Sequence, residues 1–218
     1  MAALRAERPL QPGCPCATRS PHRGAGLMLY VVRHGRTESN ASGLLLGRGD
    51  PPLDELGLLQ ARATAEAIGP VDRIVSSPLL RARQTAEEFG SDIELDDRWI
   101  ELDYGDFDGR PVAEVSPETW AAWRDDLDWA PPGGESHRQL GARVRQACDD
   151  LLDEAAIRDI VVLTHVSPVK TAMAWALGVG DEVAWRCFVE TASVTSIGTG
   201  RGGPSLRGFN DTGHLHGL

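Results

Sequence analysis

The stretch LMLYVVRHGRTESN, residues 27–40, decides how this chain is expected to fold. Its apolar part, residues 28–32, is a short run next to a glycine-containing segment, which predicts a buried strand. The run ends in Arg33 and His34, two polar side chains that a buried strand does not need for its stability. Because ligand sites of open parallel sheets form beyond the carboxyl ends of the strands, these two residues indicate a functional site there.

Strands and helices are expected to alternate over most of the chain. Strands are predicted at residues 28–32, 71–77, 92–97 and 158–165, with a final strand pair at 193–199 and 205–210. Helices are predicted at residues 54–68, 78–90, 134–156 and 168–177. This alternation predicts an α/β fold, a three-layer α/β/α sandwich with a mostly parallel central sheet.

Two arginines and two histidines are candidates for one common site. His165 ends the second apolar strand as His34 ends the first, and Arg33 and Arg81 stand close to strand ends. Such a set fits an oxyanion, because the planar guanidinium matches the geometry of phosphate oxygens. A neutral imidazole is also a competent nucleophile toward phosphorus near pH 7. Each histidine taken alone could equally be a hydrogen-bonded core or surface residue.

Composition limits the classes of partner. The chain has 218 residues and a mass of 23.5 kDa, which suits one domain. Apolar residues make up 41%, and the net charge is -10 with a pI near 5.0. An acidic chain lacks the positive footprint that nucleic acids and anionic membranes require, so neither is an expected partner. A local arginine cluster can still bind a small anionic substrate.

The first 26 residues differ from the rest of the chain. They are rich in proline, glycine, alanine and arginine, and they contain no apolar segment suited to a signal peptide. We interpret residues 1–26 as a disordered N-terminal tail and residues 27–218 as the folded domain. A start assigned too far upstream, with Met28 as the true start, is an alternative interpretation.

The four cysteines favour free thiols. Cys14 and Cys16 are too close together for an ordinary disulfide framework, and no metal-binding spacing follows them. With Cys148 and Cys187, they indicate a protein of the reducing cytoplasm. No apolar run of about 18 residues is present, so no membrane-spanning helix is expected.

Five ordered segments carry a family resemblance. They are VVRHGRTESN (31–40), SSPLLRARQTA (76–86), IELDYGDFDG (100–109), PPGGES (131–136) and VVLTHVSPVK (161–170). In this order they resemble the blocks of the histidine phosphatase superfamily, the phosphoglycerate-mutase-like proteins, over about residues 28–200. The resemblance implies the phosphoglycerate-mutase-like sandwich and places the chain with the phosphatase branch.

The resemblance also implies roles for the four candidate residues. His34 aligns with the nucleophile that becomes transiently phosphorylated. Arg33 and Arg81 align with residues that hold the phosphoryl oxygens, whereas Arg83 is expected to be a solvated helix residue. His165 aligns with a donor that stabilises charge during the transfer.

Further residues are assigned by the same alignment. Glu101 matches the proton donor, which protonates the leaving alkoxide and then takes a proton from the attacking water. Asn40 is expected to contact the phosphate, and Thr37 to contact it directly or to support it through a hydrogen bond. Tyr104 is expected to line the substrate entrance, with simple packing as the alternative.

Several charged residues are expected to be bystanders. Asp103, Asp106 and Asp108 surround Glu101 in sequence and are interpreted as solvated loop acids. In the same way Lys170, Arg143 and Arg145 are interpreted as surface charges.

Two positions depart from the family pattern. Arg36 stands where many members carry Glu or Gln, and it either adds positive charge at the mouth of the site or is a surface residue. Val166 and Ser167 follow His165 where two glycines are common, and Ser167 is expected to cap the next helix.

The segment 110–134 is short and lacks the arginine-bearing insertion of the mutases, which favours water as the phosphoryl acceptor. Its tryptophans, Trp120, Trp123 and Trp129, are expected to pack a lid helix onto the core. A hydrophobic wall of a substrate pocket is the alternative.

These inferences combine into one expected function. The chain is expected to be a metal-independent phosphomonoesterase that hydrolyses a small phosphorylated metabolite through a phosphohistidine, with no cofactor and no metal site. Mutase-type phosphoryl transfer and a non-catalytic phosphate-binding module are the alternatives. A homodimer is left open, and the substrate is not identified.

Overall fold

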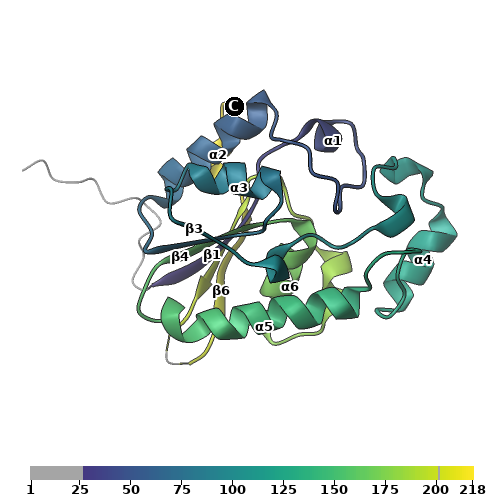
Figure 1. Cartoon of the computed structure of the whole chain (residues 1–218). Helices are drawn as coiled ribbons and strands as arrows, with labels where there is room; N and C mark the ends of the chain where they lie inside the picture. The colour runs from purple at the N-terminus through teal and green to yellow at the C-terminus, as the bar shows by residue number, and fades with distance from the viewer. Residues whose placement is uncertain (1–26, 201) are drawn as a thin grey trace, which may run out of the picture.

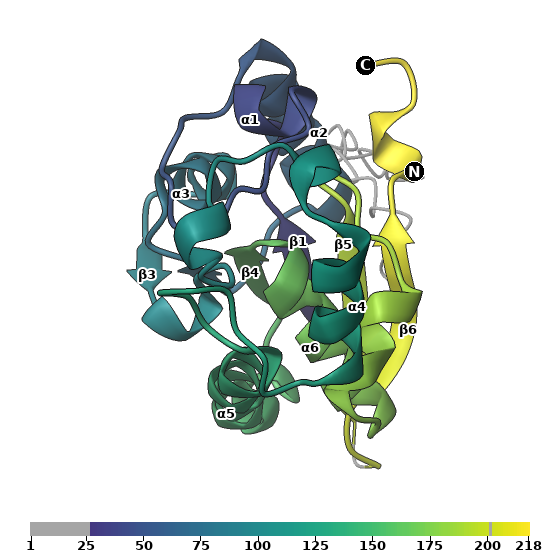
Figure 2. The same ribbon diagram turned by 90° about the vertical axis from the view of Figure 1, so that its right-hand side faces the viewer.

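The central element of the computed structural model, which describes residues 27–200 and 202–218, is a single sheet of six strands in the order β3-β2-β4-β1-β5-β6. The strands are β1 (Met28–Arg33), β2 (Arg73–Ser76), β3 (Ile93–Leu95), β4 (Ile160–Thr164), β5 (Val194–Gly198) and β6 (Ser205–Asp211). The strands β3, β2, β4 and β1 are parallel, whereas β5 pairs antiparallel with both β1 and β6. Figure 2 shows β3 and β6 at opposite edges of the sheet. The predicted tail, with Cys14 and Cys16, lies outside the described residues.

Helices cover both faces of this sheet. They are α1 (Glu38–Ala41), α2 (Glu55–Ile68), α3 (Leu80–Glu87), α4 (Pro117–Asp125), α5 (His137–Ala155) and α6 (Val166–Leu177). Short 3-10 helices are η1 (Asp97–Trp99), η2 (Gly105–Phe107), η3 (Val112–Glu114), η4 (Asp181–Arg186) and η5 (Gly213–Leu215). In Figure 1, α2 and α3 lie above the sheet and α5 and α6 below it, which confirms the predicted three-layer sandwich.

The core is divided by the sheet into two clusters. Leu29 and Val31 of β1 belong to the cluster that contains residues of α5 and α6, whereas Tyr30 and Val32 pack with residues of α2 and α3. Successive strand residues point to opposite faces of the sheet, so the sequence of a strand that is buried on both sides is one continuous apolar run. This explains why residues 28–32 could be identified from sequence.

Every predicted strand and helix is present, with shifted ends. Helix α1 was not expected, and α4 is the lid helix expected in the segment 110–134, for which no bounds were predicted. Ser116 is the N-cap of helix α4, since its side chain accepts from the Thr119 amide, and Pro117 follows in the first turn. The expectation that Ser167 caps α6 was wrong, because the capping position is His165 and Ser167 lies inside the first turn.

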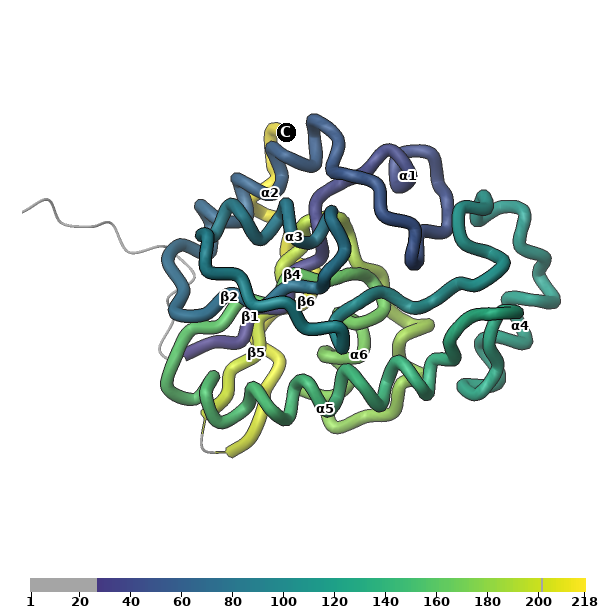
Figure 3. Tube along the Cα trace, viewed as in Figure 1, coloured from purple at the N-terminus to yellow at the C-terminus, as the bar shows by residue number. Residues whose placement is uncertain are grey.

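The strand register determines where the site lies. The backbone amide of His34 donates to Thr164 O at 2.9 Å, and the amide of Ser77 donates to Leu163 O at 2.9 Å. The carboxyl ends of β1, β4 and β2 therefore meet side by side. In Figure 3, α4 lies at the end of the molecule toward which β1 runs.

Two further findings bear on the sequence expectations. Cys148 and Cys187 are free thiols, and Cys148 is buried. Within residues 27–200 and 202–218, none of the helices combines the length and apolar character needed to cross a lipid bilayer.

Candidate active site

The His34 side chain is buried and has a defined tautomer. Its Nδ1 lies 2.6 Å from the Gly35 carbonyl oxygen, and since a carbonyl can only accept, Nδ1 carries the proton. The other nitrogen, Nε2, accepts from Arg81 Nε at 3.2 Å. Burial, with Arg81 and Arg33 nearby, holds the pKa of His34 well below its usual 6.5. The imidazole is therefore neutral near pH 7, with its lone pair on Nε2.

Glycines allow helix α2 to approach this residue closely. A Cβ on Gly35 would overlap the Gly57 carbonyl, and a Cβ on Gly57 would overlap the Arg36 carbonyl. The Gly35 amide also donates to Thr85 Oγ1 at 3.1 Å, which ties the segment to α3. The loop after β1 thus holds His34 between two helices.

Backbone carbonyls fix Arg81, and no carboxylate pairs with it among the residues that the structure describes. Its Nη1 donates to Gly49 O at 2.7 Å and its Nη2 to Gly47 O at 2.9 Å, which leaves Nε for His34. The side chain is 0% exposed. Burial lowers the pKa of Arg81 to about 10, so its guanidinium remains charged at neutral pH. A buried cation of this kind suits a bound phosphoryl group.

Asp108 organises the loop that carries those two carbonyls. Its Oδ1 accepts from the Gly47 amide at 2.8 Å, and its Oδ2 accepts from the amides of Arg48 at 2.8 Å and Gly49 at 2.7 Å. The interpretation of Asp108 as a solvated loop acid was therefore wrong. It acts on Arg81 through the loop 47–49, across about 60 residues of sequence.

We expect Asp108→Asn to lower kcat/KM for phosphate esters about tenfold, with most of the effect in KM. The amide keeps one acceptor oxygen and turns an NH2 group toward backbone donors, so the loop 47–49 loses charge-assisted hydrogen bonds. Steady-state kinetics and the inhibition constant of inorganic phosphate measure the effect. Asp106→Asn, at an exposed position in the same segment, is the matched control. Unchanged constants in Asp108→Asn would show that the loop does not position Arg81.

The side chains of His165 and Arg33 bring further nitrogen atoms close to His34. The rings of His34 and His165 have centroids 5.1 Å apart. His165 Nε2 lies 2.7 Å from Ser77 Oγ, and burial holds the pKa of His165 well below its usual value. Arg33 Nη1 donates to Val189 O at 2.8 Å. The His165 Nδ1 and Arg33 Nε atoms are buried and find no hydrogen-bond partner among the described residues.

Glu101 lies at the amino-terminal end of helix α6. The carboxylate is 2% exposed. Its Oε1 accepts from the Leu102 amide at 2.7 Å, and its oxygens also accept from the amides of Val166 at 3.0 Å and Ser167 at 3.2 Å. A carboxylate is favoured at a helix N-terminus, where the backbone N–H groups are unpaired. Val166 and Ser167, which depart from the family pattern, thus contact Glu101 through their backbone.

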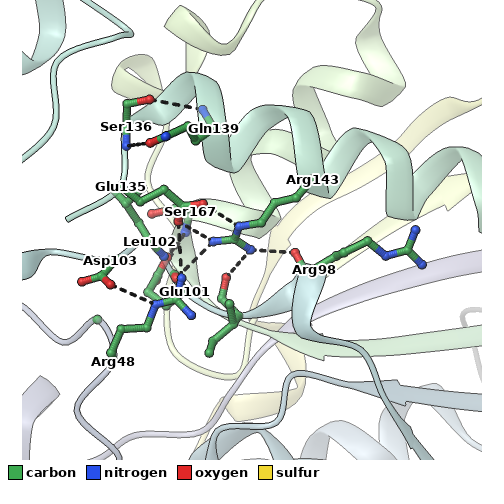
Figure 4. Close-up of polar contacts among 12 residues, drawn as sticks. Arg48, Arg98, Glu101, Leu102, Asp103, Glu135, Ser136, Gln139, Arg143 and Ser167 are labelled. Atoms are coloured by element: carbon green, nitrogen blue, oxygen red, sulfur yellow. Dashed lines mark hydrogen bonds and ion pairs between the residues drawn. The ribbon is translucent and has the colours of Figure 1, made fainter. Parts of the chain in front are cut away.

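Arg143 of helix α5 positions the segment that carries Glu101 (Figure 4). Its Nη1 donates to Arg98 O and Ile100 O, both at 2.7 Å, and its Nη2 reaches Glu101 O at 3.2 Å. The same guanidinium pairs with both oxygens of Glu135, at 2.8 and 2.7 Å. The interpretation of Arg143 as a surface charge was therefore wrong, because it cross-links α5 to the backbone around Glu101.

Asn40 and Thr37 form the cap of helix α1. Thr37 accepts from the Asn40 amide at 3.2 Å, and Asn40 Oδ1 accepts from the Thr37 amide at 3.1 Å. Among residues 27–200 and 202–218 no hydrogen bond joins either side chain to His34, so phosphate contacts by these two residues stay a prediction. Arg36 pairs with Asp54 at 2.8 Å, and Arg83 is exposed as expected.

Tyr104 and the tryptophans gather on the α6 side of Glu101. Tyr104 packs edge-on against Trp123 with centroids 5.7 Å apart, and it interacts with the Ser167 side chain. Trp120 stacks on the buried Trp123 with ring centroids 5.4 Å apart, and the Trp129 ring lies tilted against Trp123 at 5.2 Å. The expected packing of a lid helix onto the core is confirmed, and Trp120 and Trp123 also line a cavity together with Lys170 of α6. No cluster of three or more metal-ligating side chains is found in the described part of the chain.

Comparisons with known proteins agree with this arrangement. A protein of Mycobacterium tuberculosis named as bifunctional is 34% identical over 220 residues, which is 96% of this chain and 59% of that protein. The chain therefore spans less than two thirds of the length of that relative. A mycobacterial glucosyl-3-phosphoglycerate phosphatase solved with vanadate superposes with a TM-score of 0.75 at 31% identity, covering 86% of this chain and 100% of the other.

A second solved structure is the phosphoserine phosphatase of Entamoeba histolytica in complex with 3-phosphoglyceric acid. It superposes with a TM-score of 0.79 at 28% identity, covering 86% of this chain and 98% of the other. Residues 29–212 match the sequence profile of the histidine phosphatase superfamily (branch 1). With this match over most of its length, the chain belongs to the histidine phosphatase superfamily.

Proposed function

We propose that this protein is a metal-independent phosphomonoesterase that acts on a small phosphorylated metabolite through a phosphohistidine. The observation that carries the proposal is the neutral His34, whose Nε2 lone pair faces the charged Arg81. The two solved relatives described above are named as phosphatases of small phosphorylated metabolites, which supports the same substrate class.

In the first step, His34 Nε2 attacks phosphorus and the bond from phosphorus to the ester oxygen breaks. Arg81 and Arg33 neutralise the phosphoryl oxygens, and His165 donates to them. Glu101, acting in its protonated form, gives its proton to the departing oxygen, so that an alcohol leaves. Positioning and charge neutralisation account for most of the catalysis of phosphoryl transfer.

In the second step, water attacks the phosphohistidine. Glu101, now a carboxylate, accepts the water proton, the bond from nitrogen to phosphorus breaks, and inorganic phosphate leaves. The hydrogen bond from Nδ1 to the Gly35 carbonyl keeps the same ring nitrogen available in each cycle. His34 and Glu101 thus return to their starting states.

Two alternatives are less well supported. A mutase must hold and reorient a bisphosphate, and the short segment 110–134 offers only Arg110 and Arg124 for that purpose. A pure binding module needs no acid, whereas Glu101 is buried beside the charges of Arg33 and Arg81.

A cytoplasmic location is proposed with the phosphatase activity and is supported by the free thiols of Cys148 and Cys187. The homodimer stays a prediction.

The test is phosphate release from a panel of small phosphomonoesters in the presence of EDTA. We expect turnover of at least one ester, with rates that EDTA changes by less than about twofold, because arginines supply the positive charge. A strong loss with EDTA would contradict the metal-free mechanism. No release from any ester would favour the mutase or the binding module.

A further inference from the structure

The backbone segment 189–193, between η4 and β5, holds the residues Arg33 and His34 in place. The amide of Ala192 donates to His34 O at 3.0 Å, and the amide of Arg33 donates to Ser193 O at 3.2 Å. The segment lies outside the five sequence blocks that carry the family resemblance. It nevertheless fixes the backbone of the proposed nucleophile and of the arginine before it.

The side chain of Arg33 is oriented by the same segment. Its Nη1 donates to Val189 O at 2.8 Å, whereas its buried Nε has no hydrogen-bond partner in the part of the chain that the structure describes. Because the guanidinium is a rigid planar fork, holding one of its nitrogens limits the directions in which the other N–H groups point. The position of Val189 O therefore helps to decide where the Arg33 donors meet a phosphoryl group.

The backbone of the 189–193 segment is strained. Ala192 has a φ of 57°, in the left-handed region that residues with a Cβ disfavour. Within residues 27–200 and 202–218, only one other non-glycine residue has a positive φ, and this is Asn210 of β6, at 54°. Strained conformations persist where the surrounding structure enforces them, and they cluster at functional sites. Contacts from other parts of the chain must therefore keep Ala192 in this conformation.

Two side chains near the C-terminus supply such contacts. His214 Nε2 lies 3.1 Å from Ala192 O and 3.0 Å from Thr64 Oγ1, and since a carbonyl only accepts, Nε2 carries the proton and donates. Asn210 Oδ1 accepts from the Glu190 amide at 2.6 Å. The chain ends beside α2, the helix that carries Thr64 (Figure 1). The segment is thus held at two points by residues that follow it in sequence.

We propose that His214 and Asn210 are positioning residues of the active site, which hold the 189–193 segment in the strained conformation that orients Arg33 and His34. The proposal rests on the proposed phosphatase function, because it concerns the same site. Both residues act through backbone groups of the segment, one through a carbonyl and the other through an amide. The C-terminal end of the chain therefore belongs to the catalytic architecture.

A double-mutant cycle between positions 214 and 192 tests this role. His214→Leu removes the donor and is expected to lower kcat/KM for 4-nitrophenyl phosphate about tenfold, because small displacements of the reacting groups are costly. In the Ala192→Gly background the same substitution should cost less than about threefold, since glycine adopts a positive φ without enforcement. If His214 only stabilised the fold, the loss would be equal in the two backgrounds, and that result would overturn the proposal.

Conservative variants separate the hydrogen bonds from the bulk of the side chains. His214→Gln keeps an N–H donor and should lose less than about threefold in kcat/KM, and His216→Leu, at an exposed histidine nearby, should match the wild type. Asn210→Gly keeps the left-handed backbone but removes the acceptor of the Glu190 amide, so a loss of about three- to tenfold is expected even if His214→Leu does not fold. Wild-type kinetics in Asn210→Gly, or equal losses in His214→Gln and His214→Leu, would contradict the proposal.

Measurements without turnover separate this result from a failure of the phosphatase function. In protein with isotope-labelled histidine, the Nδ1–H resonance of His34 is identified by its absence from His34→Ala. We expect His214→Leu to shift this resonance and to weaken the binding of inorganic phosphate, measured by calorimetry, about tenfold, whereas His216→Leu does neither. If the resonance and the phosphate affinity stay as in the wild type, His214 does not position Arg33 and His34, whichever esters the protein hydrolyses.

Discussion

His34→Ala is expected to lower kcat for phosphate esters by about 10⁴-fold or more, because the variant lacks the ring nitrogen that is proposed to form the covalent intermediate. The buried ring offers Nε2 as its lone-pair nitrogen, and its neighbour Arg81 makes the position suitable for an anion. Phosphate release from 4-nitrophenyl phosphate measures the loss. Radiolabelled substrate should also leave label on the wild-type chain after denaturation in alkali, and none on the variant.

The matched control is His216→Ala, which removes an exposed histidine. Its activity should equal that of the wild type, and circular dichroism should show that both variants fold. Full activity in His34→Ala would mean that the nucleophile is another residue. Loss of turnover with label still trapped on the chain would point to the same conclusion.

Glu101→Gln is expected to lower kcat/KM for alkyl phosphates by about 10²- to 10⁴-fold, the range typical of a lost general acid. For 4-nitrophenyl phosphate the loss should be about tenfold or less, because nitrophenolate leaves without a proton. The constant kcat/KM is the proper measure, since it reports the steps up to the first departure of the leaving group. The amide keeps the size of the side chain but turns an NH2 group toward backbone amides, a structural effect that should fall equally on both classes of ester, so the difference between the two losses measures the missing acid.

Asp106→Asn serves as the control for Glu101→Gln, because it neutralises an exposed carboxylate five residues away. Both classes of ester should be hydrolysed by this variant as by the wild type. Equal losses on alkyl and aryl esters in Glu101→Gln would remove Glu101 as the general acid. The carboxylate would then be a structural cap of α6, a role that its three backbone donors also allow.

Much of the fold could be predicted because its signals are local. A strand buried on both faces is apolar at every position, as at residues 28–32, and a helix carries its own start signal, as at Asp54, which accepts from the Gly57 amide at 2.7 Å. The bounds of the lid helix α4 could not be predicted, because the helix is short and lies in a segment rich in tryptophan and aspartate, where no clear periodicity appears.

Local sequence signals could not identify the residues that position Arg81 and Glu101. Asp108 and Arg143 contact backbone groups that are 42 to 61 residues away in sequence. The sequence gives no sign of such a contact, because a charged residue has the same local pattern whether its side chain faces water or a distant backbone group. Lys170 was interpreted as a surface charge for the same reason, although it lines a cavity. Its being the single lysine of the chain was the one sequence signal that could have drawn attention to it.

The sequence by itself determined the α/β class and the placing of His34 and His165 at strand ends, because both follow from apolar runs that stop at a polar residue. The tertiary structure alone decided which ring nitrogen of His34 is free, how Arg81 is held, and what surrounds Lys170. These properties depend on hydrogen bonds and on packing between segments that are far apart in the sequence. Those contacts form only after the folded sheet has brought the ends of its strands together.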